Sequence, residues 1–230
     1  MKEFFIESVF FGVVISIICY EAGVWMKKKF KMAIFNPLLV SIVFVILFLV
    51  VFDIDYKVYE QGAQYLAYLL TPATVALAVP LYEQIEPLKR NWKAILAGIF
   101  AGTMTSVVCV LVMSILFGLS HEQYVTLLPK SITTAIGMGV SQELGGIVTI
   151  TVAVIVITGV LGNVMAETVC HIFKIKEPIA VGIGIGSSSH ALGTAKALEV
   201  GELEGAMSSL SIAISGLMTV VAANVFANFY

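Results

Sequence analysis

Five long stretches of the chain contain no Asp, Glu, Lys or Arg, and they constrain the fold more than any other feature of the sequence. They are Met32–Phe52, Gly62–Tyr82, Ala94–Ser120, Leu144–Ala166 and Gly205–Tyr230. A helix needs about 20 mostly apolar residues to cross a bilayer, and each stretch is long enough. Charged residues make up only 12% of the chain, whereas soluble domains carry about 25%. The sequence therefore predicts an all-α polytopic membrane protein with the lipid bilayer as its solvent.

A sixth apolar stretch, Phe4–Met26, has Glu7 and Glu21 near its ends. It lacks a basic leader and a convincing small-residue cleavage site, so we interpret it as a retained helix rather than a signal peptide. The lysine cluster that follows, Lys27 to Lys31, marks the cytoplasmic side and places the N-terminus outside. We therefore expect a multi-pass protein of the cell (inner, cytoplasmic) membrane.

Prolines punctuate the second and third stretches. Asn36-Pro37 predicts a helix start, because proline suits the first helical position. In the third stretch, Thr71-Pro72 and Pro80 allow two interpretations. Either the backbone breaks and a short helix starts at Pro72, with Thr74 in its first turn, or the helix has a simple proline kink.

One polar segment occurs twice. Ser131–Leu144 and Ser187–Val200 align without a gap, with identities at Ser131/Ser187, Ala135/Ala191, Gly137/Gly193 and Glu143/Glu199. Both copies are small and hydroxyl-rich, and a long apolar run follows each. Internal repeats with interrupted helices are typical of transporters that bind their substrate near the membrane midplane. The doubled segment is therefore where we expect a binding site.

The length of the repeat limits its topology. At about 1.5 Å per residue, Ser131–Glu143 spans roughly 20 Å, short of a ~30 Å hydrocarbon core. If both copies cross fully, the repeats are parallel and Lys174 and Lys176 lie outside. If both re-enter, the repeats are inverted and these lysines lie inside, as the positive-inside rule prefers. We expect about six transmembrane helices plus two re-entrant or broken helices arranged as an inverted repeat, with full crossing as the alternative.

The same pattern predicts the organisation of the chain. Residues 1–118 form N-terminal helices, which we expect to serve as scaffold and oligomerisation surface. Residues 119–230 form the repeat core, with units 125–171 and 178–230.

Half-helix starts inside a membrane carry unpaired N–H groups and a positive dipole end, which suits a small carboxylate anion. The residues that we expect to bind it are Lys130, Ser131, Thr133, Thr134, Ser187, Ser189, His190, Thr194 and Thr74. For coupling to a proton or cation, the candidates are His190, Glu143 and Glu199. His190 leads because the unperturbed pKa of histidine is about 6.5.

Each candidate also has a purely structural interpretation. Lys130 could snorkel to the interface, and His190 could pack between helices, bonded to a carbonyl. The hydroxyls could return hydrogen bonds to their own helix. Glu143 and Glu199 could be solvated at the hairpin mouths. Lys196, two turns into the second copy, needs a protein or water partner at that depth.

Other chemistries find little support. The three cysteines, Cys19, Cys109 and Cys170, are odd in number and their spacing suits no metal site. Gly182–Gly186 lacks the preceding strand and spacing of a nucleotide-binding loop, and no basic stripe predicts a nucleic-acid partner. Ser189 and His190 are adjacent, so on a helix they point apart and form no nucleophile–base pair. We expect no metal, no cofactor and no enzyme activity.

Several motifs together resemble the LrgB/CidB family. The segments are Asn36–Leu39, Leu69–Tyr82, Leu128–Thr134, Ser189–Ala195 and Glu204–Leu210. The resemblance covers nearly the whole chain. One departure is Ala135, which stands where the family pattern leads us to expect proline, so the break in that helix lies earlier, at Pro129, or is softer.

The resemblance implies two roles. Bacterial members are named as antiholin- or holin-like modulators of murein hydrolase activity and autolysis, and usually work beside a small LrgA/CidA-type membrane partner. The plant relative is similar to a plastid glycolate/glycerate translocator, and bacterial relatives are linked to pyruvate uptake. We expect a homo-oligomeric transporter of small monocarboxylates with an alternating-access mechanism, optionally proton-coupled. The alternative is a holin/antiholin-like regulator acting with an LrgA/CidA-type partner.

Overall fold

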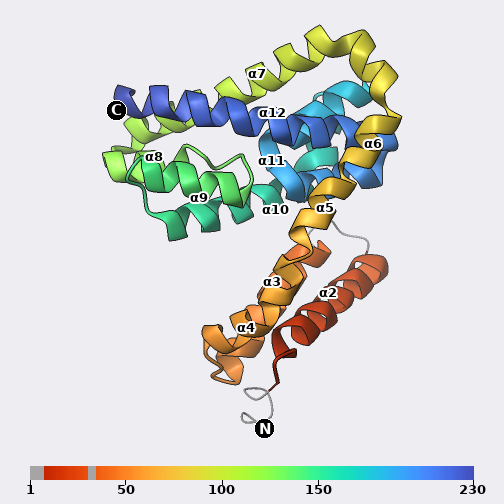
Figure 1. The fold of residues 1–230 in the computed structure, drawn as a ribbon, viewed down its shortest axis with the longest axis vertical. Helices are drawn as coiled ribbons and strands as arrows, with labels where there is room; N and C mark the ends of the chain where they lie inside the picture. The colour runs from red at the N-terminus through yellow and green to blue at the C-terminus, as the bar shows by residue number, and fades with distance from the viewer. Residues whose placement is uncertain (1–7, 31–34) are drawn as a thin grey trace. The chain divides into compact units, whose positions relative to one another are not determined.

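A computed structural model describes residues 8–30 and 35–230, and every regular element in this part is helical (Figure 1). The elements are α2 (Phe11–Phe30), α3 (Pro37–Val51), α4 (Tyr56–Ala67), α5 (Leu70–Ala76), α6 (Ala78–Glu83), α7 (Ile85–Phe117), α8 (His121–Leu127), α9 (Thr134–Glu143), α10 (Val148–Ile172), α11 (Pro178–Val200), α12 (Glu202–Phe226) and a final 3-10 turn (Ala227–Phe229). The chain divides into two compact units, Met1–Ala76 and Leu77–Tyr230.

Four helical stretches of the described part are long and apolar enough to cross a membrane. They are Tyr56–Glu83, Ile85–Phe117, Val148–Ile172 and Glu202–Phe229. Helix α3 is equally apolar but shorter. These helices confirm the predicted all-α polytopic membrane fold. The start of the predicted sixth span, together with Lys31 and Met32, lies outside the described residues.

In the first unit, α2 packs against α3 and α4. The side chain of Asn36 caps α3 by accepting a hydrogen bond from the backbone N–H of Leu38 at 2.9 Å, and Pro37 takes the first helical position. The predicted start of this helix is therefore confirmed. Gly12 allows the close approach of α2 to α4, because a Cβ at this position would overlap the backbone of Tyr59 and Ala63.

The third apolar stretch is interrupted, but not where the prolines suggested. Helix α4 ends at Ala67, and α5 begins at Leu70, so Thr71 does not cap a helix that starts at Pro72. Pro72 and Pro80 instead lie in the first turns of α5 and α6. Proline is tolerated there because N–H groups of a first turn have no intrahelical acceptor. Thr74 lies in α5, but its side chain is outside the described part of the structure.

In the second unit, α7 begins at Ile85, so the charged segment before Ala94 is helical rather than a connection. The helix ends at Gly118, whose φ of 61° is a left-handed conformation that glycine adopts without strain. Ser120 then starts α8 with a capping box that includes Gln123. The predicted outer loop, Gly118 to Tyr124, is therefore largely replaced by a short helix, because Ser120 satisfies its first N–H groups.

Helix α11 is a hairpin rather than a through-going helix. Its first arm advances along α12, with Gly182 against Met207 and Gly186 against Ser211. The chain breaks at His190, where φ is 43° and ψ is −140°. The second arm then returns along the same stretch of α12. The Thr194 hydroxyl lies 2.7 Å from that of Ser208, and Leu198 packs against Gly205. Both ends of α11 therefore lie beside the start of α12, and the segment doubles back on itself, as the re-entrant interpretation predicts.

Helices α8 and α9 form the matching hairpin on α10. Thr126, in the first arm, accepts a hydrogen bond from the Ile147 N–H at 2.8 Å through its hydroxyl, and its carbonyl accepts one from the Thr151 hydroxyl at 2.9 Å. In the second arm, the Ser141 hydroxyl lies 2.7 Å from that of Thr151. Gly137, closer to the tip, packs on Ile155. The contacts run forward along α10 and back again, as they do along α12.

The two hairpins correspond at a fixed offset of 56 positions, the separation of Ser131 from Ser187. A Cβ at Gly137 would lie 3.5 Å from the Pro129 carbonyl, and a Cβ at Gly193 would lie 3.2 Å from the Ile185 carbonyl. Each pair connects the two arms of its own hairpin, and the residues of the second pair follow those of the first by the same 56 positions. The repeat is therefore structural, and in both hairpins its shared glycine lies against a carbonyl of the opposite arm.

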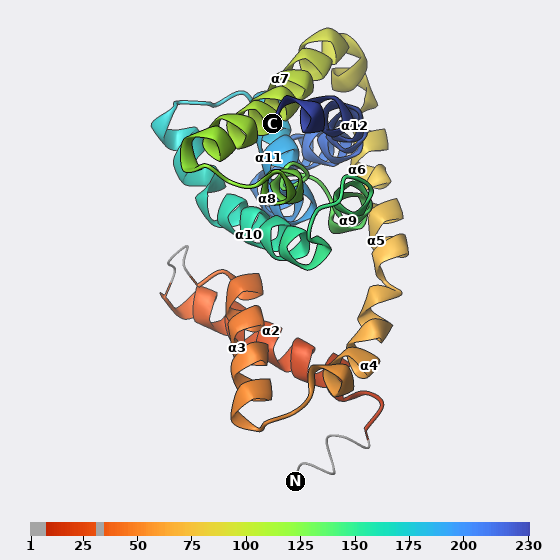
Figure 2. The same cartoon turned by 90° about the vertical axis from the view of Figure 1, so that its left-hand side faces the viewer.

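The two repeat units run in opposite directions. The first hairpin lies beside the start of α10, and the second unit begins where α10 ends. Glu204, at the start of α12, lines one cavity together with Cys170 and His171, at the end of α10. Figure 1 shows α8 and α9 near the C-terminal end of α12 and α11 nearer its start, and in Figure 2, which looks along α12 from its C-terminal end, α8 lies in front of α11. The arrangement is an inverted repeat of hairpin plus span, as predicted.

Candidate functional site

The tips of the two hairpins converge on one stripe of α7. The Ser131 hydroxyl, at the first tip, lies 2.9 Å from the Ser106 hydroxyl. Ser187, near the second tip, contacts Gly102, where an added Cβ would lie 2.7 Å from its hydroxyl oxygen. Residues four apart on a helix share a face. The equivalent serines of the two repeats therefore contact α7 within one turn of each other.

A second meeting point lies on α10, at Ile155. The side chain of Ile155 packs against Gly137 of the first hairpin. Its carbonyl oxygen lies 3.0 Å from Nε2 of His190, at the tip of the second hairpin. Because a carbonyl only accepts hydrogen bonds, Nε2 carries the proton. Contacts on two separate helices thus bring the two tips to the same level of the core.

The break at His190 is held by its neighbours on α10. His190 is buried and packs against Gly159, while Ser189 packs against Gly162. The Asn163 amide donates to the Leu192 carbonyl at 2.6 Å. A non-glycine residue with positive φ is strained, and such strain persists only where the surroundings fix it. These contacts therefore fix the tip in one position.

Among the described residues, Lys130 is the cationic side chain at the first tip. Its ammonium donates to the Ser131 hydroxyl at 3.0 Å and is half-buried. Among the described residues, it forms no ion pair with a carboxylate. Thr133 occupies the cap position of α9 with a ψ of 147°, although its side chain makes no capping hydrogen bond, and Thr134 begins the helix. The first break thus lies between Pro129 and Thr134, which agrees with the earlier of the two positions that Ala135 left open.

The second copy differs from the prediction in where its half-helix starts. Ser187 and Ser189 were expected at a helix start, but they end the first arm. The Ser187 hydroxyl donates to its own helix, at the Ile183 carbonyl (2.7 Å). The second arm starts after His190, and Thr194 donates to the His190 carbonyl at 3.0 Å. The sequence alignment could not show this because it began at Ser187 and missed the whole first arm.

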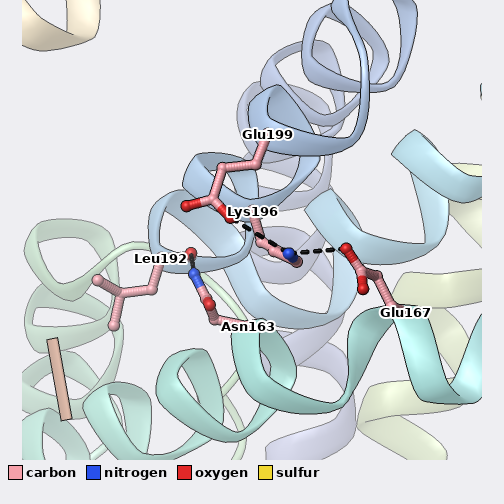
Figure 3. A network of polar contacts seen from close by, with 5 residues as sticks. All are labelled: Asn163, Glu167, Leu192, Lys196 and Glu199. Carbon is pink, nitrogen blue, oxygen red and sulfur yellow. Dashed lines mark hydrogen bonds and ion pairs between the residues drawn. The ribbon is translucent and has the colours of Figure 1, made fainter. Parts of the chain in front are cut away.

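The acidic candidates lie at the hairpin mouths. Glu143 ends α9 and is exposed. Glu199 is bonded to Lys196 at 3.2 Å, and Lys196 also pairs with Glu167 of α10 at 2.7 Å (Figure 3). The predicted need of Lys196 for a partner is therefore met by two carboxylates. At the offset of the repeat, Val140 stands in the place of Lys196, so the first hairpin lacks this ion pair.

Sequence reasoning missed the residues that other helices contribute. Asn163 and Glu167 of α10 hold the second arm (Figure 3), and Ser106 of α7 holds the first tip. Asn163 did carry a signal, because it is an amide inside a charge-free run, and Glu167 follows it by one helical turn. Within the described part of the chain, no group of three His, Cys, Asp or Glu side chains could hold a metal ion.

The arrangement suits a small anion. The second arms of both hairpins start at the tips, so the positive ends of their dipoles lie there. Lys130 adds a full charge, and burying an ammonium without a counter-charge is unfavourable until an anion arrives. Serine and threonine hydroxyls supply orienting hydrogen bonds, whereas the Nε2–H of His190 is already held by the Ile155 carbonyl.

Comparison with known proteins gives one consistent result. The profile of the LrgB-like family matches residues 16–229. The protein named Antiholin-like protein LrgB from Bacillus mycoides (strain KBAB4) is 37% identical over 221 residues, which cover 96% of each chain. The protein of the same name from Bacillus cereus (strain B4264) is 36% identical over the same share of both chains. No solved structure matches the chain.

Proposed function

Because the chain belongs to the LrgB-like family, we propose that this multi-pass membrane protein carries small monocarboxylates, of the pyruvate, glycolate and glycerate class, across the cell membrane. One observation carries the proposal: Ser131 and Ser187, equivalent residues of an inverted repeat, contact α7 within one turn of each other. Burying two polar hairpin tips in the middle of an apolar core is unfavourable in free energy, and polar groups at such depth usually serve a function. A binding site between them accounts for that cost.

The mechanism follows from the inverted repeat. Lys130 and the starts of the two second arms attract the carboxylate, and Ser131, Thr133 and Ser189 orient it. His190 adds a donor to it when Nδ1 is protonated, because Nε2–H is held by the Ile155 carbonyl. Movement of one hairpin at a time would expose the site first to one side and then to the other, as in other inverted-repeat carriers. No catalytic chemistry is needed for this cycle.

Two neighbouring cavities near the end of α10 are compatible with alternating access. A cavity of about 510 Å³ opens among Lys174, Lys176 and Glu204. A second cavity of about 280 Å³ shares part of its wall and extends to Ser188, the neighbour of Ser189. The larger cavity lies at the end that carries the lysines, which the positive-inside rule assigns to the cytoplasm.

Uptake of labelled pyruvate and glycolate into proteoliposomes tests the proposal. We expect Lys130→Met to lower uptake at least tenfold, because it removes the charge at the first tip, whereas Lys57→Met on the exposed surface of α4 should have no effect. His190→Gln keeps an N–H donor for the Ile155 carbonyl but cannot titrate. If His190 couples a proton, this variant should transport without responding to a pH gradient.

Two results would contradict the proposal. Absence of uptake by the wild-type protein would reject transport of these acids. Uptake at the wild-type rate by Lys130→Met, and by a His190→Ala variant, would remove both residues from the site.

A second role is supported by the names of the relatives, which call them antiholin-like. In this role, the chain would regulate murein hydrolase activity and autolysis through a homo-oligomer or a small LrgA/CidA-type partner. The discriminating experiment measures autolysis in cells that carry Lys130→Met. A lysis phenotype that persists when transport is abolished would favour regulation over transport.

A further inference from the structure

Thr103 of α7 is buried without a hydrogen bond. Only 2% of the residue is exposed, and within the described part of the chain its hydroxyl has no partner. Threonine in a helix can always bond the carbonyl one turn earlier. Ser187 and Ser211 in the same core do so, at 2.7 Å each. Thr103 forgoes this bond, and an unpaired buried hydroxyl is unfavourable.

The position of Thr103 links it to the hairpin tips. It lies one residue from Gly102, which contacts Ser187, and three residues from Ser106, which bonds Ser131. Residues three apart on a helix are neighbours on its surface. Thr103 therefore borders the stripe of α7 that the two serines contact.

The packing of α7 shows which neighbouring helix Thr103 faces. One turn before Thr103, Ile99 belongs to a cluster with Met207 of α12, and one turn after it, Val107 belongs to a cluster with Ala222 of α12. Between Met207 and Ala222, α12 carries Ser215, which is buried and bonds its own helix at 3.3 Å. Thr103 thus lies between two apolar clusters, on the side of α7 that packs against α12.

We propose that Thr103 is a substrate-contacting specificity residue, whose hydroxyl bonds a second oxygen carried by the substrate on the carbon next to the carboxylate. The inference rests on the proposed function and assigns one residue to the oxygen that pyruvate, glycolate and glycerate share and that acetate lacks. A site built to hydrogen-bond a substrate oxygen discriminates strongly against the analogue that lacks it.

The test compares uptake of glycolate and acetate, which differ by one hydroxyl, in proteoliposomes. The wild type should prefer glycolate. Thr103→Val keeps the shape but removes the hydroxyl, and we expect glycolate uptake to fall at least tenfold while acetate uptake stays the same. Thr103→Ser should retain the preference. The matched control is Ser114→Ala, which removes the other unpaired buried hydroxyl of α7 at a distance from the tips and should change neither rate.

Stability provides an independent readout. Thr103→Val should be as stable as the wild type or more so, because the substitution removes a buried hydroxyl that makes no hydrogen bond within the described part of the chain.

An unchanged glycolate-to-acetate uptake ratio in Thr103→Val, or an equal loss of both uptake activities, would overturn the inference without contradicting the proposed transport function. If Thr103→Val fails to fold, the ratio in Thr103→Ala decides in the same way. Uptake of neither acid by the wild type would overturn both the inference and the proposed function.

Discussion

Replacing Gly162 by alanine tests the docking of the second hairpin on α10. A Cβ at this position would overlap the side chain of Ser189. Ser189 is only 2% exposed and precedes the strained His190, so it has no room to turn away. The hairpin tip must shift instead. Overpacking a core of this kind typically costs about 1–3 kcal/mol.

Thermal unfolding in detergent measures the effect. For a chain of this length, each kcal/mol corresponds to roughly 2–4 °C, so we expect Gly162→Ala to lower Tm by about 5 °C. Because the overlap involves only the Ser189 side chain, adding Ser189→Gly should restore most of the loss. The matched control is Gly139→Ala in α9, where an added Cβ meets nothing within 4 Å. It should be neutral or stabilise by about 0.5–1 kcal/mol, as alanine does in a helix interior.

The reasoning fails if Gly162→Ala melts at the wild-type temperature, or if Ser189→Gly gives no rescue. Either result would mean that the second hairpin does not pack on α10 as described. A loss in Gly139→Ala equal to that in Gly162→Ala would show instead that the assay reports glycine replacement in general.

Two further predictions concern the ion pair and the topology. Lys196→Met and Glu167→Gln should each cost about 1 kcal/mol or less, with a coupling energy near 0.5 kcal/mol in a double-mutant cycle, because the Glu167 side chain is 65% exposed; additive losses would rule out the pair. In a chain without its three native cysteines, single cysteines at Glu177 and Glu202 should react with an impermeant thiol reagent from the same side of the membrane, and one at Glu143 from the opposite side. Reaction of Glu177→Cys and Glu202→Cys from different sides would replace re-entry by full crossing.

The repeat allowed the sequence to predict a large part of the core. The alignment of Ser131 with Ser187 predicted two equivalent broken segments, and their shortness predicted re-entry. The shared glycines, Gly137 and Gly193, now have a physical reason, because each lies against a carbonyl of the opposite arm. Such features are visible in the sequence because they depend on residues of the repeat itself.

The sequence placed the breaks less well. The run from Ser187 to Leu192 contains no glycine or proline, yet the helix breaks at His190. The cause lies on α10: the Ile155 carbonyl holds the imidazole, and the Asn163 amide holds the Leu192 carbonyl. The first arms of both hairpins were missed for a related reason. In sequence, these first arms resemble an ordinary apolar helix or a loop. Only their contacts with α10 and α12 identify them as arms of hairpins.

The sequence by itself determined that the chain is apolar, helical and internally repeated, because these properties follow from composition, from the length of charge-free runs and from residue identity at a fixed offset. Only the tertiary structure decided that the two tips meet on α7, that Lys196 reaches Glu167, and that Thr103 is left without a partner. Each of these depends on side chains from helices far apart in the sequence, and helix periodicity carries no information about which of them will face one another.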